Sequence, residues 1–206
     1  MRFNSILLVV LFLLSLFSCS DTLFYRAGAD YFPLTPGSRW KYLAGEDTVE
    51  VEVDTVPAVM LNQNCIRVYR NAAPEYYLIS PFEVRRLVLN AIPRPNAPDT
   101  VECRFSLYYQ LPLVVGNTYF DRFDTTLIYG PDTLQYSHLI SGRIAALEQI
   151  SVGAGNYHDC YRIEFNEKIV AFDTTETVWS EWLAPGIGVV RRQTAQGDEI
   201  LVEYQP

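Results

Sequence analysis

Hydrophobic and acidic residues alternate along residues 48–54, which read Thr-Val-Glu-Val-Glu-Val-Asp. A period of two places the three valines on one face of an extended chain and the acidic side chains on the other. This pattern predicts a β-strand with one buried face and one face toward solvent.

Short runs rich in β-branched and aromatic residues recur along the rest of the chain. They predict strands over residues 65–70, 75–79, 84–89, 101–109, 125–129, 134–140, 143–150, 161–165, 168–172, 177–183, 188–192 and 199–204. Turn-forming residues such as Gly45-Glu46-Asp47 separate them, and no window shows the stripe of an amphipathic helix. The sequence therefore predicts an all-β protein with an antiparallel sheet, either a curved half-barrel or a sandwich.

Matching fragments in the same order predict that the fold consists of two related halves. Residues 32–40 and 111–119 both read x-Pro-Leu-x-x-Gly-x-x-aromatic. Further matches pair residues 64–68 with 159–163, 75–78 with 180–183, and 84–86 with 190–192. The offset between the copies grows from 79 to about 105 residues, so we expect insertions in the second copy.

A proline-rich segment, residues 92–98, lies between the two copies. Its three prolines cannot donate backbone hydrogen bonds to a sheet, which favours an extended connector. It separates repeat halves 31–92 and 99–206. Because each half alone is small, we expect one β domain over residues 31–206, with the connector joining two halves of one continuous sheet.

The first 18 residues have the pattern of an export signal. One basic residue precedes an apolar run of about a dozen residues, which is too short for a comfortable membrane span. The segment ends Leu16-Phe17-Ser18-Cys19, which resembles the lipobox of bacterial lipoproteins, where the cysteine is acylated and becomes the new N-terminus. We expect a signal peptide over residues 1–18, lipidation of Cys19 and a tether over residues 19–30.

The net charge of the chain bears on which partners it can bind. Removal of the signal peptide takes away one arginine and no acid, so 15 basic residues remain against 24 acidic ones, a formal charge of −9. Nucleic-acid phosphates would be repelled, so no nucleic-acid partner is expected. No polybasic patch follows the leader, and attachment to the membrane is therefore expected through acylated Cys19. The expected location is the bacterial cell envelope, at the outer membrane, on its periplasmic or surface face.

Three cysteines remain after Cys19, namely Cys65, Cys103 and Cys160. One disulfide and one free thiol is one interpretation in an exported protein. Burial of all three as small apolar residues is the other, and the equivalent places of Cys65 and Cys160 in the two copies favour it. The chain has no C-x-x-C pair of the kind that redox and zinc sites use.

No combination of residues identifies a catalytic, metal or cofactor site. His158 lies beside Asp159, but neighbouring residues on a strand point to opposite faces and do not form a catalytic triad. His138 lies within a predicted strand, and the two histidines lack the spacing of a zinc motif. Recurrent Asp-Thr pairs do not supply the several ligands within one loop that calcium needs. We therefore assign no catalytic residue, no metal and no cofactor.

Aromatic residues are the candidates for ligand binding. Trp179 and Trp182 are an odd number of positions apart, so a regular strand would turn one toward the core and the other away from it. Together with Tyr77, which matches Trp182 in the first copy, they form our candidate ligand-binding set. Core packing is the alternative for all three.

Two motifs at opposite ends of the chain carry a family resemblance. Residues 31–42 contain PLxxGxxWxY, and residues 182–190 contain WxAPGxGxV. Together they resemble a broad set of bacterial, Bacteroidetes-like lipoproteins of uncharacterised function. The resemblance implies an antiparallel β domain, in some members a curved half-barrel, and it brings no catalytic residues. Pro185-Gly186 is typical of a tight turn, and Gly188 of a close backbone approach or a bulge.

Three functions fit these observations. The first is a lipid-anchored module that binds an envelope protein, glycan or lipid without catalysis, which an exposed aromatic patch or a free sheet edge would favour. The second is a carrier of a lipid or other hydrophobic ligand, which needs an apolar cavity on the order of several hundred Å³. The third is a carboxylate-based hydrolase, which needs two neighbouring acids with separated proton affinities. We expect the first, and no enzymatic activity.

Overall fold

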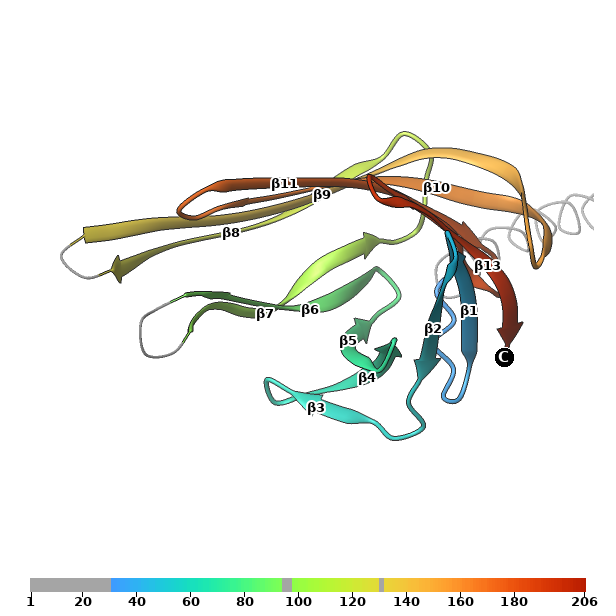
Figure 1. Cartoon of the computed structure of the whole chain (residues 1–206), viewed down its shortest axis with the longest axis horizontal. Helices are drawn as coiled ribbons and strands as arrows, with labels where there is room; N and C mark the ends of the chain where they lie inside the picture. The colour runs from blue at the N-terminus through green and yellow to red at the C-terminus, as the bar shows by residue number, and fades with distance from the viewer. Residues whose placement is uncertain (1–30, 94–97, 130–131) are drawn as a thin grey trace, which may run out of the picture.

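The computed structural model describes residues 31–93, 98–129 and 132–206, which form β-strands joined by turns (Figure 1). Cys19 and the expected signal peptide and tether lie outside the described residues. Within the described part of the chain, no helix has the length and apolar character needed to cross a membrane.

The described residues form thirteen strands. In chain order they are β1 (Arg39–Ala44), β2 (Asp47–Val53), β3 (Ala58–Met60), β4 (Gln63–Arg70), β5 (Ala73–Ile79), β6 (Glu83–Ile92), β7 (Asp99–Gln110), β8 (Thr118–Tyr129), β9 (Asp132–Val152), β10 (Gly155–Val170), β11 (Thr174–Ala184), β12 (Gly188–Thr194) and β13 (Gly197–Gln205).

All of these strands pair antiparallel in one curved sheet with the order β7-β6-β5-β4-β2-β1-β13-β12-β11-β10-β9-β8, and β3 pairs with β4 beside this path. The sheet thus consists of two six-stranded meanders that meet where β1 pairs with β13. It curves so far that the β6–β7 hairpin lies beneath the long strands β8 to β11 (Figure 1). The predicted all-β antiparallel fold is confirmed. Of the two predicted forms, a curved half-barrel and a sandwich, the structure has the single curved sheet.

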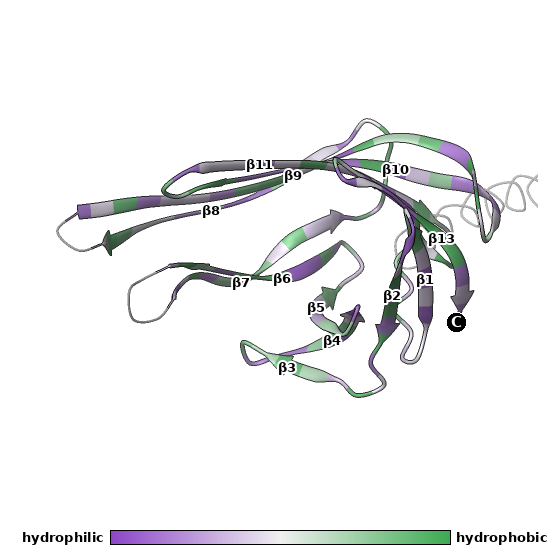
Figure 2. Cartoon of the chain, viewed as in Figure 1, coloured by the Kyte–Doolittle hydropathy of each residue, from purple (hydrophilic) through white to green (hydrophobic). Residues whose placement is uncertain are grey.

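Alternation along the strands explains how this sheet buries its core. In β2, Val49 and Val53 are buried, whereas Glu50 between them is exposed. Hydrophobic and hydrophilic residues also alternate along the long strands (Figure 2). The side chains that point inward form one large core inside the curve, and a smaller cluster around Ile92, Val101 and Tyr136 packs between β6–β7 and β9.

The two matching segments that precede β1 and β8 share the backbone geometry around their glycines, although the Leu111–Pro112 peptide bond is cis and the matching Phe32–Pro33 bond is not. The Gly37 amide donates to the Val53 carbonyl at 3.0 Å, and the Gly116 amide donates to the Ile144 carbonyl at 2.8 Å. Both glycines have a φ that other residues rarely adopt, +89° and +94° respectively. This shared geometry favours the predicted duplication, which itself stays a prediction.

The proline-rich connector lies within the first series of strands. It joins β6 to β7, which are neighbours in one antiparallel hairpin. The chain instead passes from the first meander to the second after β7, along residues 111–117. The boundary between the two meanders therefore lies after β7. It does not lie at residues 92–99, between the repeat halves 31–92 and 99–206, because β7 pairs with β6.

Side chains join the two edge strands, β7 and β8, where the described sheet has no backbone ladder. Asp121 on β8 accepts hydrogen bonds from the Leu107 amide at 2.7 Å and from the Ser106 hydroxyl at 3.2 Å. The same carboxylate forms an ion pair with Arg104 at 2.9 Å. We call the contacts across these two edges the seam. They bring the sheet close to closure.

The three cysteines of the described chain carry free thiols. Cys65 on β4 and Cys160 on β10 are buried, as the packing interpretation expected. Cys103 on β7, in contrast, is exposed. Burial raises the pKa of both the Cys65 and the Cys160 thiol, which keeps them protonated and unreactive at neutral pH.

Candidate functional site

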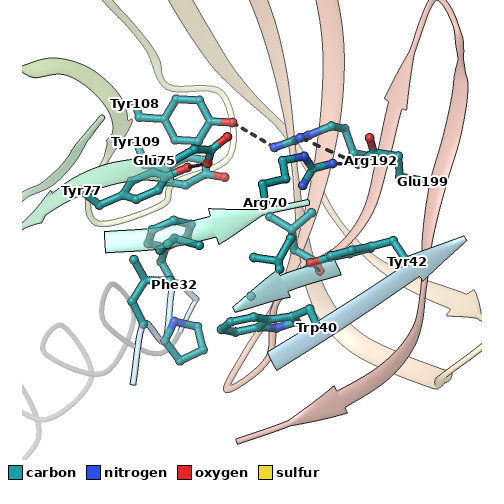
Figure 3. Close-up of a pocket in the computed structure, with 16 residues that line it drawn as sticks. Phe32, Trp40, Tyr42, Arg70, Glu75, Tyr77, Tyr108, Tyr109, Arg192 and Glu199 are labelled. Carbon is teal, nitrogen blue, oxygen red and sulfur yellow. Dashed lines mark hydrogen bonds and ion pairs between the residues drawn. The ribbon is translucent and has the colours of Figure 1, made fainter. Parts of the chain in front are cut away.

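A pocket opens inside the curve of the sheet, between β1, β2, β4 and β5 on one side and β7, β12 and β13 on the other (Figure 3). Its volume is about 60 Å³, which is room for a few water molecules. Six aromatic side chains line it, namely Phe32, Trp40, Tyr42, Tyr77, Tyr108 and Tyr109. The charged residues of the lining are Arg70, Glu75, Arg192 and Glu199.

Hydrogen bonds to one short stretch of backbone hold two of the aromatic walls in place. Trp40 donates from its indole nitrogen to the Ile187 carbonyl at 2.6 Å, and the Tyr42 hydroxyl donates to the Val189 carbonyl at 2.8 Å. Gly188 lies between these two carbonyls, and a Cβ there would lie 3.5 Å from Cδ of Pro33. The opening and closing motifs of the sequence therefore meet in space beside this pocket.

The turn before Gly188 has the geometry that its residues favour. The Ile187 amide donates to the Ala184 carbonyl at 3.2 Å, and Gly186 has a φ of +71°. Pro185 and Gly186 thus take the second and third positions of a type II turn. This turn leads the chain directly into β12 and so places Gly188 and Val189 at the pocket.

Charges along the polar wall of the pocket are balanced. Arg70 pairs with Glu199, and Arg192 approaches the same carboxylate at 3.8 Å. Glu75 accepts a hydrogen bond from the Tyr77 hydroxyl at 2.6 Å. Two guanidinium groups and two carboxylates therefore face the pocket with a net formal charge of zero, and each of these four groups has a partner.

A buried carboxylate stands behind this wall. Glu181 accepts hydrogen bonds from the hydroxyls of Tyr108, at 2.7 Å, and Tyr109, and it pairs with Arg192 at 2.7 Å. Its side chain has no exposed surface. Burial alone would raise the pKa of Glu181, but Arg192 and the two hydroxyls outweigh this and lower it. Glu181 is therefore a fixed anion that positions two tyrosines and one arginine of the pocket.

A second buried polar cluster lies near the seam. His138 on β9 is held between Glu102 of β7, at 2.8 Å from Nδ1, and Glu167 of β10, at 3.0 Å from Nε2. Burial opposes the charge on His138, but the two carboxylates outweigh it and raise the pKa of His138 to about 9. Burial likewise opposes ionisation of Glu102, whose hydrogen bonds from His138 and Tyr136 nevertheless lower its pKa to about 2.

The two carboxylates of this cluster have the same protonation state at neutral pH. Hydrogen bonding to His138 also lowers the pKa of Glu167, against the effect of burial. Both acids are therefore anions at neutral pH, whereas a carboxylate pair that catalyses hydrolysis needs proton affinities that differ. Among the described residues, no group of three or more His, Cys, Asp or Glu side chains is placed to hold a metal ion.

A wider and more open depression, of about 520 Å³, lies between the β3–β4 turn and strands β6 and β7. Leu61 and Phe105 contribute apolar surface to it, but Glu83, Arg85 and Arg104 contribute charge. Arg85 pairs with Glu83 at 2.6 Å, so an ion pair lies in its wall. This surface has a mixed character and is not a continuous apolar cavity.

The three aromatic residues that the sequence singled out lie in different places. Tyr77 lines the pocket and is buried. Trp179 stacks on Phe165 with ring centroids 4.8 Å apart. Trp182 is also buried, and because it follows Glu181 along β11 it points to the other side of the strand, where it donates to Glu148 at 2.6 Å. The structure does not bring these three residues together.

Several lining residues were not among the sequence candidates. Phe32, Trp40 and Tyr42 belong to residues 31–42, the motif that carries the family resemblance. Their signal is present in the sequence, but the resemblance does not mark it as a binding site. Arg70 and Arg192 gave no signal, because their convergence depends on the pairing of β4 and β12 with strands distant in sequence.

Comparison with known proteins supports the fold. Residues 108–205 match the DUF3108-like family, a span that covers the end of β7 and all of β8 to β13. The crystal structure of "a putative lipoprotein" from Parabacteroides distasonis is similar with a TM-score of 0.50 and 16% identity, over 85% of this chain and 98% of that one. "A putative exported protein with YmcC-like fold" from Bacteroides fragilis has a TM-score of 0.46 and 13% identity, over 85% and 99% of the two chains. No curated protein matches the chain.

Proposed function

We propose that this protein is a lipid-anchored lipoprotein of the bacterial cell envelope that binds a ligand or partner without catalysis. The export pattern and Cys19 at the end of a lipobox-like sequence support the location. The description of the similarly folded Parabacteroides protein as a lipoprotein is in keeping with it. The outer membrane is the proposed site of attachment.

The pocket inside the curved sheet is the observation that carries the binding role. Its aromatic walls offer flat apolar surface, and the paired Arg70 and Glu199 offer hydrogen-bond donors and acceptors. A few polar groups among aromatic walls are typical of small-molecule sites. Because the charged groups already have partners and Glu181 is a fixed anion, this arrangement is suited to binding more than to proton transfer.

The same observations give less support to the two alternatives than to binding. A lipid carrier needs an apolar cavity on the order of several hundred Å³, whereas this pocket measures about 60 Å³ and an ion pair lies in the wall of the wider depression. A hydrolase needs acids with separated pKa values, whereas the pKa values of both Glu102 and Glu167 are lowered.

Native mass spectrometry tests the binding role. Residues 20–206 are purified without detergent and incubated separately with a lipid extract and with an extract of the water-soluble small molecules of the same cells. The proposal predicts a reproducible added mass from the water-soluble extract, lost in Tyr42→Ala at the pocket and kept in Tyr69→Ala outside it. Added mass released as lipid would instead support the carrier, and absence of added mass from both mixtures would contradict a ligand in this pocket.

Fractionation of cells tests the anchor. The full chain is expected in the membrane fraction, and Cys19→Ser is expected among the soluble envelope proteins because it cannot be acylated. Membrane association that survives Cys19→Ser would contradict the proposed lipid anchor.

A further inference from the structure

The segment Tyr31–Leu34 reaches the pocket from the N-terminal side and forms part of its wall. Phe32, Pro33 and Leu34 all line the pocket. The Phe32 ring lies beside Tyr77 and Tyr109 (Figure 3), with centroid distances of 5.4 and 5.2 Å. The tilted and edge-on angles of these contacts are the favourable ones for aromatic pairs. The protein's own phenyl group thus occupies an aromatic site.

Side chains contribute much of what holds this segment to the other described residues, and the Tyr31 hydroxyl donates to the Asp159 carbonyl at 3.0 Å. Within the described part of the chain, the Leu34 amide donates to the Phe32 carbonyl at 3.0 Å. This backbone hydrogen bond is internal to the segment. In the matching segment of the second copy, the Leu111 amide donates to the Phe82 carbonyl at 2.7 Å and so ties that segment to the turn before β6. The first segment is held mainly by its side chains.

The two copies also differ in how well the segment fills its site. Leu111 and Leu113 in the second copy are 7% and 2% exposed. Their counterparts Phe32 and Leu34 are only partly buried, and about 60 Å³ of space remains beside them. Closely packed interiors leave few voids larger than a water molecule. The incomplete packing of one copy therefore marks the place where a ligand can be accommodated.

We propose that Phe32 is a displaceable occupant of a binding site for an aromatic ring that carries an uncharged polar substituent. This inference rests on the proposed binding function and names the ligand class of the same pocket. The ligand's ring takes the place of the phenyl group against Tyr77 and Tyr109. Its substituent extends into the remaining space and reaches the charged wall.

Charge balance in the wall determines the nature of the substituent. Arg70 and Glu199 satisfy each other, and Glu75 is bonded to Tyr77, so the wall has no net charge to offset an ion. A charged substituent would lose its hydration without gaining an unpaired partner, which is costly. A hydroxyl or an amide can donate to a carboxylate and accept from a guanidinium while these ion pairs remain.

The ligand competes with the Phe32 ring for the same site. This competition determines how much the affinity for the ligand should rise when the ring is removed. Burial of a phenyl group stabilises the folded protein, and a ligand has to replace this contribution when it displaces Phe32. Removal of the phenyl group should therefore tighten the binding of a small aromatic ligand on the order of tenfold or more. In the intact protein, binding should release Phe32 and the residues next to it from the pocket.

Fluorine NMR with 4-fluorophenol tests this on residues 20–206. We expect Phe32→Ala to bind 4-fluorophenol on the order of tenfold more tightly than the unchanged protein, and 4-fluorobenzoate more weakly than 4-fluorophenol. Phe82→Ala is the matched control, because Phe82 is 74% exposed on a turn and does not line the pocket. Equal affinities in the unchanged protein and Phe32→Ala, or stronger binding of the benzoate, would overturn the inference.

Amide exchange in the unchanged protein gives a second test that needs no variant. Saturating 4-fluorophenol should speed exchange at Leu34 and leave exchange at the matching Leu113 unaltered. No change at Leu34 when the ligand is bound would contradict displacement of Phe32. These results are independent of the mass-spectrometry experiment, so an added mass from the water-soluble extract with no effect of Phe32→Ala would reject this inference and keep the proposed function.

Discussion

Two buried charged side chains, His138 and Glu181, each bind several residues from other strands in the interior of this protein. His138 binds Glu102 and Glu167 from two other strands, and Glu181 binds Arg192 and two tyrosines. Removal of one partner from a buried charged group leaves the other without compensation, which costs about 3–5 kcal/mol. Such residues therefore determine local stability more strongly than the many exposed ion pairs do.

We expect stability to fall at alkaline pH because of His138. Its pKa is about 9 in the folded protein, compared with roughly 6.5 for an unfolded histidine. A pKa raised by folding means that the stabilisation is complete below the unfolded pKa and is lost as the pH rises through the folded one. Urea unfolding between pH 6 and pH 9.5 should show a loss of roughly 3 kcal/mol in the free energy of unfolding.

The two histidines of the chain provide the control. In His138→Gln most of this pH-dependent loss should disappear, and the protein should be less stable at pH 6. The remaining loss near pH 9.5 should come from Cys65 and Cys160, because folding also raises the pKa of these thiols. His158→Gln should keep the slope of the unchanged protein, because His158 is exposed. An unaltered slope in His138→Gln would show that another group causes the alkaline loss.

At the scale of the strands, Gly142 shows how tertiary packing overrides a local signal. The sequence predicts two strands, 134–140 and 143–150, with a break near this glycine, whereas β9 runs without interruption from Asp132 to Val152. Gly142 lies opposite Tyr119 on β8, and a Cβ at this position would lie 2.2 Å from the ring carbon Cζ. The glycine therefore makes room for a ring and does not end a strand.

Gly142→Ala should destabilise the protein by roughly 2–4 kcal/mol, because the added methyl group displaces the Tyr119 ring. The displaced ring also loses its hydrogen bond to the Tyr108 carbonyl, at 2.7 Å, across the seam. Thermal unfolding measures the effect. The double variant with Tyr119→Ala should cost less than the sum of the two single changes. Gly153→Ala is the comparison variant and should cost less, because a Cβ there would lie 3.1 Å from Cγ1 of Val202, compared with 2.2 Å from the Tyr119 ring at Gly142.

Strand content was predictable from the sequence, but the bounds of the strands were not. The acid–valine alternation of β2 is a property of neighbouring residues, and it led to the correct element. β1, β3 and the first part of β8 were not predicted, since their residues acquire partners only when the sheet forms. The proline-rich connector was assigned to the boundary between the halves because pairing of β6 with β7 leaves no local signal.

For the whole molecule, closure depends on the seam between β7 and β8. Asp121 is the principal link, because its carboxylate binds Arg104, Ser106 and the Leu107 amide on the opposite edge. These partners lower its pKa, although burial alone would raise it. Sequence reasoning does not reach this link, just as it does not reach Arg70 and Arg192, because strand order decides which distant residues meet.

Asp121→Ala should lower the free energy of unfolding by roughly 2–4 kcal/mol and speed amide exchange at Leu107. Asp124→Ala is the matched control on the same strand, where an exposed ion pair with Arg122 should contribute little. Urea unfolding and hydrogen exchange measure both effects. Similar losses for the two variants would contradict a special role of the seam.

The pairing of β1 with β13 has a consequence for how the chain folds. Other neighbours in the described sheet are consecutive strands, apart from the short β3 between β2 and β4. Only Arg39–Ala44 and Gly197–Gln205 come from opposite ends of the domain. Local hairpins form quickly, whereas a contact between distant segments must first close a long loop. Each meander can thus assemble by itself during synthesis, and the union of the first strand with the last becomes the slow step that completes the fold.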